Sequence, residues 1–258
     1  MNELKYIFYT QNLTIFANME DEWIKHVNAD NVDYWYRSTD GTFSYFNPSS
    51  DELSKQGWFK HKSTSHQQYY WHNIYSDETA WRKPLIHTAR VAIIVPFRDL
   101  HVEQQRSAHL KRFVEYMSKY MEAAFIPFKI FIVEQSDDKL KFNRGKLLNI
   151  GYVLAREEQY DTFIFHDVDL LPSLNLVTSY RIQPKDKSPL HIARVWNRYN
   201  NNPKYFGGIV SFSTEQFALI NGFPNNFWGW GGEDDEMMNR VGEVSRYIYN
   251  ACTCRCIS

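Results

Sequence analysis

From about residue 90 onward, the chain alternates short apolar runs with amphipathic stretches. Three short, largely apolar runs, at 91–95, 128–133 and 162–165, predict strands, and the continuous run at 91–95 is expected to be buried on both faces. In the two stretches between them, apolar residues recur at intervals of three and four, which predicts helices. The order strand, helix, strand, helix, strand is typical of a parallel sheet with right-handed crossovers. We therefore expect an α/β domain over residues 89–258.

The first 88 residues follow another pattern, an internal repeat at an offset of 35 residues. Each copy holds an aromatic residue, a polar turn, a run of three aromatic residues, another turn and a final aromatic residue. The matched positions are Trp23 with Trp58, Lys25-His26 with Lys60-His61, Tyr34-Trp35-Tyr36 with Tyr69-Tyr70-Trp71, and Phe46 with Trp81. We predict small all-β modules at 20–50 and 55–86, and an incomplete third copy at 1–19.

The second copy resembles a WW domain. The resemblance rests on Trp58, on Tyr70-Trp71-His72-Asn73 and on Thr79-x-Trp81-x-x-Pro84. It implies that Tyr70 and Trp81 form the walls of a groove for a proline-rich peptide in the polyproline II conformation. The alternative is that these aromatic side chains only pack against the neighbouring domain. The first copy carries Phe46 at the groove position, so peptide binding is expected mainly from the second.

Composition and charge exclude several classes of partner. The formal net charge is −1 at pH 7, so no basic field attracts nucleic acid. No apolar run approaches the roughly 18 to 20 residues that span a bilayer, and the N-terminus lacks the layout of a signal peptide. All three cysteines, Cys252, Cys254 and Cys256, lie close to the end of the chain, which fits a reducing compartment. We expect a cytoplasmic protein without a membrane span.

The third predicted strand ends on two carboxylates, Asp167 and Asp169. If the chain stays extended there, residues two apart share one face, and open α/β sheets bind ligands at this end of their strands. Two carboxylates on one face suit a hard divalent cation and a diphosphate. Taken alone, such an acidic pair at a strand end is more often a helix cap or a turn former.

A second candidate segment runs from Phe227 to Glu236, with three glycines around two tryptophans and four acids at its end. Glycines allow the backbone to move, and Trp rings stack on sugar rings. A carboxylate can accept the proton of an acceptor hydroxyl. The alternative for the acids is structural, because negative side chains favour the first turn of a helix.

Five motifs follow one another along the α/β domain. They are Pro96-Phe97-Arg98, Phe142 through Gly151, His166 through Pro172, Tyr205-Phe206-Gly207-Gly208, and Asn221 through Asp235. Together they resemble the β-1,4-galactosyltransferase family. The resemblance implies the α/β GT-A fold and an inverting transfer of galactose from UDP-galactose to a glycan or protein-linked sugar. It also implies manganese as the cofactor, with magnesium as the alternative.

The same resemblance implies roles for single residues. The donor would be bound by Pro96, Phe97, Arg98, Phe142, Arg144, Asp167, Val168, Tyr205, Gly208 and Trp230. The acceptor would be bound by Trp230, Glu233, Asp234 and Asp235. Asp169 would ligate the metal, and Asp234, beside Glu233, would act as the catalytic base. Tyr205 stands where the family selects galactose over bulkier N-acetylated sugars. The structural alternatives are surface ion pairs for the arginines and core packing for Tyr205.

The chain departs from the family at both ends. The resemblance implies that a Met and a His beyond the acidic motif complete the metal site, yet no His follows His191. The terminal cysteines offer thiolates, which suit zinc better than manganese. We therefore expect an incomplete protein ligand set around Asp169. WW-like modules stand where Golgi members of the family carry a membrane anchor, which indicates a viral protein of the factory or virion. The alternative function is a weakly catalytic transferase fold retained as a WW-bearing interaction protein.

Overall fold

The computed structural model describes residues 6–9, 23–29, 32–37, 42–44, 47, 52–55, 58–66, 68–73, 79–82, 89–100, 102–124, 126–184, 188–194, 205–229, 231–245, 249–250 and 256–257. The chain divides into two compact units. One comprises 1–13, 89–121 and 126–258 and contains the α/β domain. The other comprises 14–88 and 122–125 and contains the two predicted modules.

A seven-stranded sheet forms the centre of the α/β unit. In spatial order its strands are β1 (Tyr6–Tyr9), β9 (Phe128–Glu134), β8 (Val91–Phe97), β10 (Thr162–His166), β13 (Ile209–Ser213), β12 (Leu190–His191) and β14 (Tyr249–Asn250). The three strands predicted from the apolar runs, β8, β9 and β10, pair in parallel, as expected. The neighbours β1 and β13 run antiparallel to them, so the sheet is mixed. Strand β1 falls where the sequence predicts an incomplete module copy, and the rest of 1–19 lies outside the described residues.

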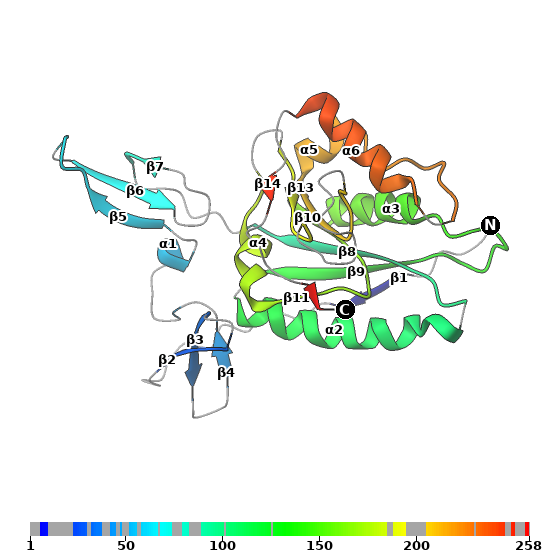
Figure 1. Ribbon diagram of the computed structural model, residues 1–258, viewed down its shortest axis with the longest axis horizontal. Helices are drawn as coiled ribbons and strands as arrows, with labels where there is room; N and C mark the ends of the chain where they lie inside the picture. Colours follow the sequence, from blue (N-terminus) through cyan, green and yellow to red (C-terminus); the bar gives the residue numbers. More distant parts are fainter. Residues whose placement is uncertain are drawn as a thin grey trace. The chain divides into compact units, whose positions relative to one another are not determined.

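Helices cover both faces of this sheet (Figure 1). The helices and 3-10 turns of the unit are η1 (Val102–Gln104), α2 (Arg106–Ala123), α3 (Arg144–Glu157), η2 (Leu174–Leu176), α4 (Val177–Arg181), α5 (Thr214–Leu219) and α6 (Glu233–Val244). Helix α2 lies on one face, and α3, α5 and α6 lie on the other. Double coverage explains why every residue of β8 and β10 is buried and why both strands are largely apolar.

The alternation along β10 distributes its side chains between the two layers. Phe163 packs against Tyr152 of α3, with ring centroids 4.7 Å apart, whereas His166 packs against Phe113 of α2 at 4.8 Å. Gly151 lets α3 approach the sheet, since a Cβ there would lie 2.3 Å from Cγ2 of Ile94. The core therefore holds the carboxyl end of β10 between two helices that approach from opposite faces.

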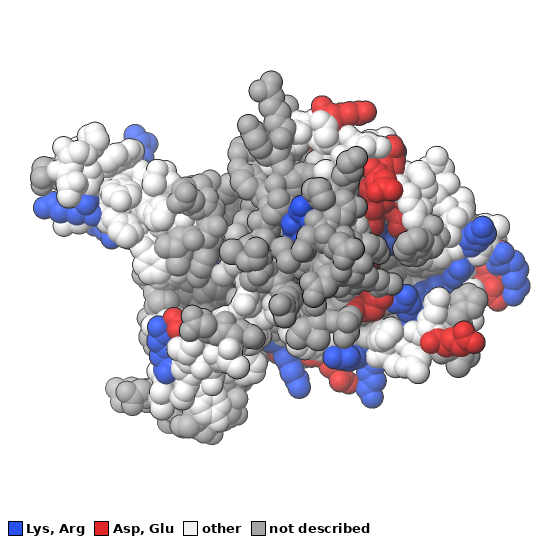
Figure 2. All heavy atoms as spheres, in the orientation of Figure 1, with Lys and Arg blue, Asp and Glu red and all other residues white. Residues whose placement is uncertain are grey.

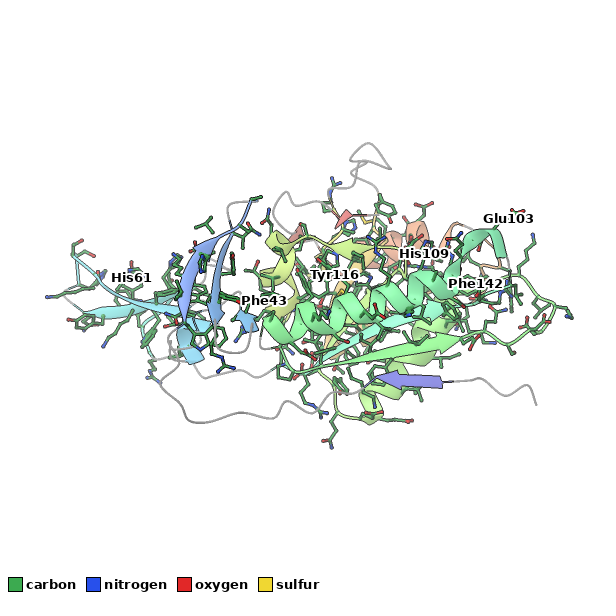
Figure 3. All side chains as sticks on the ribbon, turned by 90° about the horizontal axis from the view of Figure 1, so that it is seen from below. Phe43, His61, Glu103, His109, Tyr116 and Phe142 are labelled. Carbon is green, nitrogen blue, oxygen red and sulfur yellow. The ribbon has the colours of Figure 1, made fainter. Side chains whose placement is uncertain are left out.

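A short two-stranded pairing lies beside the main sheet. Strand β11 (Leu171–Pro172) follows the acidic pair and runs antiparallel to β15 (Cys256–Ile257) near the C-terminus. Tyr116 of α2, labelled in Figure 3, donates its hydroxyl hydrogen to the carbonyl of Pro172 at 2.6 Å. Cys252 and Cys254 lie outside the described residues.

The second unit contains two separate three-stranded antiparallel sheets. They are β2 (Ile24–Val27), β3 (Asp33–Arg37) and β4 (Thr42–Ser44), and β5 (Trp58–Lys62), β6 (Tyr69–Asn73) and β7 (Thr79–Ala80), with the single-turn α1 (Glu52–Lys55) between them in sequence. Phe43 belongs to the first sheet and His61 to the second (Figure 3). Whether either sheet is a WW domain stays a prediction.

Strand register corrects the alignment of the two copies. Lys25 lies opposite Trp35, and Lys60 lies opposite Trp71. The first strands therefore match at an offset of 35 but the second strands match at 36, because the β5–β6 turn is one residue longer than the β2–β3 turn. The predicted match of Trp35 with Tyr70 is wrong by this one residue. Continued along the chain, the same register matches Trp81 with Tyr45, which lies outside the described residues, instead of Phe46.

Candidate active site

The acidic pair lies in a turn directly after β10. The strand ends at His166, and the amide of Leu170 donates to the carbonyl of Asp167 at 3.3 Å. The expected extended conformation is therefore absent here, and the two carboxylates reach different helices. Asp167 contacts Arg144 of α3, and Asp169 contacts Arg106 of α2.

A buried histidine and tyrosine hold the start of this turn. His166 Nδ1 lies 2.9 Å from the carbonyl oxygen of Asp167, and Nε2 lies 2.7 Å from the hydroxyl of Tyr180. A carbonyl can only accept, so Nδ1 carries the proton and Nε2 accepts from the tyrosine. Burial lowers the pKa of His166 to about 4, which keeps the ring neutral. The amide of Asp167 donates to the carbonyl of Gly208 at 2.9 Å, so both backbone groups of Asp167 are fixed.

Arg144 joins the acidic pair to the acids of α6. Its Nε donates to Oδ1 of Asp167 at 2.9 Å, and its Nη1 donates to Oδ1 of Asp234 at 2.9 Å. Oε1 of Glu233 lies 3.8 Å from the same Nη1. Burial alone would lower the pKa of Arg144, but the three carboxylates raise it, so the guanidinium stays charged. Two acid clusters about 65 positions apart in sequence thus share one cation.

Two of these carboxyl groups have raised pKa values. Burial, followed by the charges of Asp167 and Glu233, raises the pKa of Asp234 to about 6, although Arg144 acts in the opposite direction. Burial also raises the pKa of Asp167. A carboxylate with a pKa near 6 is a stronger base than an ordinary aspartate and is still ionised at neutral pH. Acidic side chains gather on this face over the region of α6 (Figure 2).

The residues around the predicted metal ligand offer only part of a metal site. Oδ2 of Asp169 lies 2.9 Å from Nη1 of Arg106, and both side chains are partly exposed. A carboxylate oxygen suits a hard cation such as manganese. Within the described part of the chain, no three His, Cys, Asp or Glu side chains come together as a metal-binding group. Nε2 of the buried His191 donates to the carbonyl of Gly207 at 3.0 Å.

The predicted donor residues that the structure describes lie at the carboxyl ends of β8 and β10, at the start of α3 and just before β13. Pro96 and Phe97 end β8, and the guanidinium of the following Arg98 lies 5.4 Å from the ring centroid of Phe142. Phe142 is labelled in Figure 3. Val168 is buried within the turn that contains the acids. The hydroxyl of Tyr205 would lie 3.0 Å from a Cβ placed on Gly208, a residue with a φ of +74°.

The glycine-rich segment before α6 uses backbone conformations that side chains disfavour. Gly229, Gly231 and Gly232 have φ values of 100°, 91° and 93°. Gly232 is the N-cap residue of α6, and a Cβ on it would lie 2.5 Å from the ring of Phe227. Asp235 follows in the first turn of the helix and is exposed. Trp230 lies outside the described residues, so its predicted role is not placed.

Four residues at the site were given no role in the sequence prediction: Arg106, Asn143, Tyr180 and Gly207. Arg106 and Tyr180 act on the acidic turn from other elements, and no local pattern marks them. Asn143 carries a detectable signal, since Asn just before an apolar periodic stretch is a preferred N-cap. Gly207 stands next to Gly208 in a predicted motif, but its contact with Asp234 depends on tertiary packing.

Two family models match consecutive parts of this chain. The family model for the N-terminal region of glycosyl transferase group 7 matches residues 59–181, and that for the N-terminal domain of galactosyltransferase matches residues 187–250. Human beta-1,4-galactosyltransferase 4 is 41% identical over 159 residues, which cover 59% of this chain and 42% of that protein. The chain belongs to the β-1,4-galactosyltransferase family.

Other β-1,4-galactosyltransferases agree in sequence and fold. Mouse beta-1,4-galactosyltransferase 1 is 38% identical over 180 residues, 67% of this chain and 42% of the mouse protein. The matched part is thus less than half the length of these curated relatives. The catalytic domain of Drosophila beta1,4galactosyltransferase 7, solved with xylobiose, superposes with a TM-score of 0.56 at 34% identity, over 63% of this chain and 65% of that one. A variant of the Drosophila enzyme was solved with manganese, UDP-Gal and xylobiose. The α/β GT-A fold is confirmed.

Family membership corrects the expected location. β-1,4-Galactosyltransferases such as these relatives are typically Golgi type II membrane proteins, so the prediction of a cytoplasmic protein is wrong. Across the described residues, no helix combines the length and apolarity needed to cross a membrane.

Proposed function

We propose that this chain transfers galactose from UDP-galactose, with inversion, to a hydroxyl of a glycan or protein-linked sugar. The observation that carries the proposal is the bridge through Arg144, which holds the turn that contains Asp167 and Asp169 against Asp234. Donor-side and acceptor-side acids thereby face one site although they are distant in sequence. Family membership and the Drosophila complex with manganese and UDP-Gal support the choice of donor.

In this proposal the residues divide the reaction between two sides. Arg98 and Phe142 hold the uridine and phosphates together with Pro96 and Phe97, and Asp167 orients the galactose, which Tyr205 discriminates. Asp234 accepts the proton of the acceptor hydroxyl while that oxygen bonds to the anomeric carbon, and the bond to the UDP oxygen breaks with its electron pair. Attack from the face opposite UDP inverts the configuration. Glu233, Asp235 and Trp230 contact the acceptor.

Manganese would be held by Asp169 together with donor phosphate oxygens, and magnesium is the alternative. Bound there, the ion neutralises the charge that develops on the departing UDP. Because Asp169 pairs with Arg106 in the structure, the ion and the guanidinium would compete for the same carboxylate.

The test is UDP release from UDP-galactose with manganese, with and without a panel of acceptor sugars. The proposal expects metal-dependent release that an acceptor stimulates and that Asp169→Asn removes. Asp137→Asn is the matched control, because Asp137 forms an ion pair with Lys139 at an exposed position. The alternative, a weakly catalytic interaction protein, predicts UDP binding without turnover. Absence of metal-dependent release from the wild type would reject the enzyme proposal.

A second proposed activity, binding of a proline-rich peptide, rests on the β5–β6–β7 sheet. The ring centroids of Tyr70 and Trp81 lie 5.8 Å apart, and Trp81 is 56% exposed. His66 packs against the same indole at 5.2 Å. Two adjacent, accessible rings suit a polyproline II ligand. Titration with a Pro-Pro-x-Tyr peptide should show binding that Trp81→Ala abolishes, and no binding to the wild type would exclude this activity.

A further inference from the structure

Three consecutive residues at the start of α3 each bond to the segment 225–234. The carbonyl of Phe142 accepts from the amide of Gly229 at 2.8 Å, and Nδ2 of Asn143 donates to the carbonyl of Asn225 at 2.8 Å. Arg144 holds Asp234, as described above. In the proposed function Phe142 and Arg144 belong to the donor side, whereas 225–234 carries the acceptor side. Residue 143 therefore stands between two donor residues and bonds to the acceptor segment.

Asn143 is almost completely buried, and each of its hydrogen-bonding groups has a partner, with its carbonyl accepting from the amide of Leu147 at 3.2 Å. Its amide donates to Oε1 of Gln135 at 2.9 Å, and its Oδ1 accepts from the amide of Lys146 at 3.0 Å as the N-cap of α3. Gln135 in turn donates to the carbonyl of Lys141 at 3.1 Å. With its amide and Oδ1 committed to the loop and the helix, only Nδ2 reaches the acceptor segment.

The chain just before the acceptor segment is firmly held at Phe223, and Asn143 acts at the start of the segment. Oδ1 of Asn149 accepts from the amide of Phe223 at 2.9 Å, and its Nδ2 donates to the carbonyl of the same residue at 2.8 Å. Past Asn225 the backbone passes through Gly229, Gly231 and Gly232, all with positive φ. Glycines at such positions permit backbone movement that other residues restrict. The bond from Asn143 to Asn225 thus lies where the clamped part ends and the glycine-rich part begins.

We propose that Asn143 is a positioning residue that ties the acceptor segment to the donor side of the site. This role rests on the proposed function, because it explains how the acceptor-binding acids are held in position relative to the donor-binding residues. Loss of the Nδ2 bond would loosen the start of the segment, where Oδ1 of Asn225 also accepts from Nδ2 of Asn149 at 3.0 Å, and would weaken acceptor binding. The donor contacts, which are made by Phe142, Arg144 and the acidic turn, would persist.

Asn143→Ser is the test, because Ser is an equally good N-cap and carries no charge, yet it cannot reach Asn225. We expect the acceptor KM to rise roughly 3- to 30-fold, the range for loss of one coupling contact, while kcat changes less. The dissociation constant of UDP, measured by calorimetry with manganese, should stay near that of the wild type. Amide exchange in 225–232 should become faster in the variant.

Ser213→Ala provides the matched control. Ser213 caps α5, and its hydroxyl accepts from the amide of Gln216, so the variant loses a cap without touching 225–234. Its acceptor KM should equal that of the wild type. An unchanged acceptor KM in Asn143→Ser, or a parallel rise in the UDP dissociation constant, would overturn the proposal. If the wild type shows no turnover, the proposed function fails, but amide exchange in 225–232 still tests the positioning role of Asn143. Equal exchange rates in the wild type and in Asn143→Ser would overturn that role.

Discussion

Gly207 and Asp234 lie against each other, so that a Cβ on Gly207 would lie 2.1 Å from Oδ2 of Asp234. No side chain fits there without moving the carboxylate. We expect Gly207→Ala to shift Asp234 from its position beside Arg144 and to lower turnover about 100-fold, the cost of a misplacement of roughly 1 Å. Steady-state kinetics and UDP calorimetry should show the loss in kcat with UDP affinity retained.

Gly242 offers the control for this substitution. It lies in α6 with open space where its Cβ would be, so Gly242→Ala should leave turnover unchanged and stabilise the helix by about 0.5–1 kcal/mol. Equal turnover in Gly207→Ala and Gly242→Ala would mean that the position of Asp234 does not matter for the reaction.

Asp234→Asn should lower kcat by about two to four orders of magnitude while UDP still binds. An amide cannot accept the proton of the acceptor hydroxyl, but it can keep a hydrogen bond with Arg144 through its oxygen. The measurement is kcat beside the UDP dissociation constant. A proportional loss of both would indicate a folding defect, which circular dichroism would detect.

The pH profile should report the same carboxylate. Because the pKa of Asp234 is raised to about 6, the fraction in the base form falls as pH drops through about 6, and kcat/KM should fall about tenfold per pH unit below it. Arg144 lowers this pKa, so Arg144→Gln should move the acid limb of the profile to higher pH. A shift of the limb to lower pH would contradict the assignment.

Arg106→Gln should tighten manganese binding about fivefold, the equivalent of the roughly 1 kcal/mol that a partly exposed ion pair contributes. The guanidinium lies 2.9 Å from Oδ2 of Asp169 and must leave that oxygen before an ion takes it. Electron paramagnetic resonance of free manganese, in the presence of UDP, measures this affinity without turnover. Weaker manganese binding in the variant would show that Arg106 supports the site.

Buried His191 should make the protein less stable in acid. Burial lowers its pKa to about 4, below the ordinary value of about 6.5, so the unfolded chain binds the extra proton first. The free energy that the neutral, buried His191 contributes to folding is fully present above about pH 6.5. It is lost as pH falls toward 4, by at most about 3 kcal/mol. Urea unfolding at several pH values should show this slope, and His191→Gln, which can still donate to Gly207, should show a shallower one. Identical slopes in the wild type and in His191→Gln would refute the assignment of this pH dependence to His191.

The sequence predicted the parallel strands well because β8 and β10 are buried on both faces, and such strands need continuous apolar runs. It also located Asp167 and Asp169 at a strand end. It did not predict that the chain turns after His166, because the turn depends on Tyr180 and Gly208, which are distant in sequence. Arg144 was found as a motif residue, but its bridge to Asp234 follows from α3 and α6 packing on the same face.

The first hairpin turns of the two three-stranded sheets differ in length by one residue, which indicates where such a module can change in length. An added residue within a strand would turn every following side chain to the opposite face, whereas one in the turn leaves His61 stacked on Tyr70 as His26 is on Tyr34. Duplicated copies of this unit can therefore diverge in length at their hairpin turns while keeping one aromatic surface. Those turns are the places to insert a tag or a spectroscopic label.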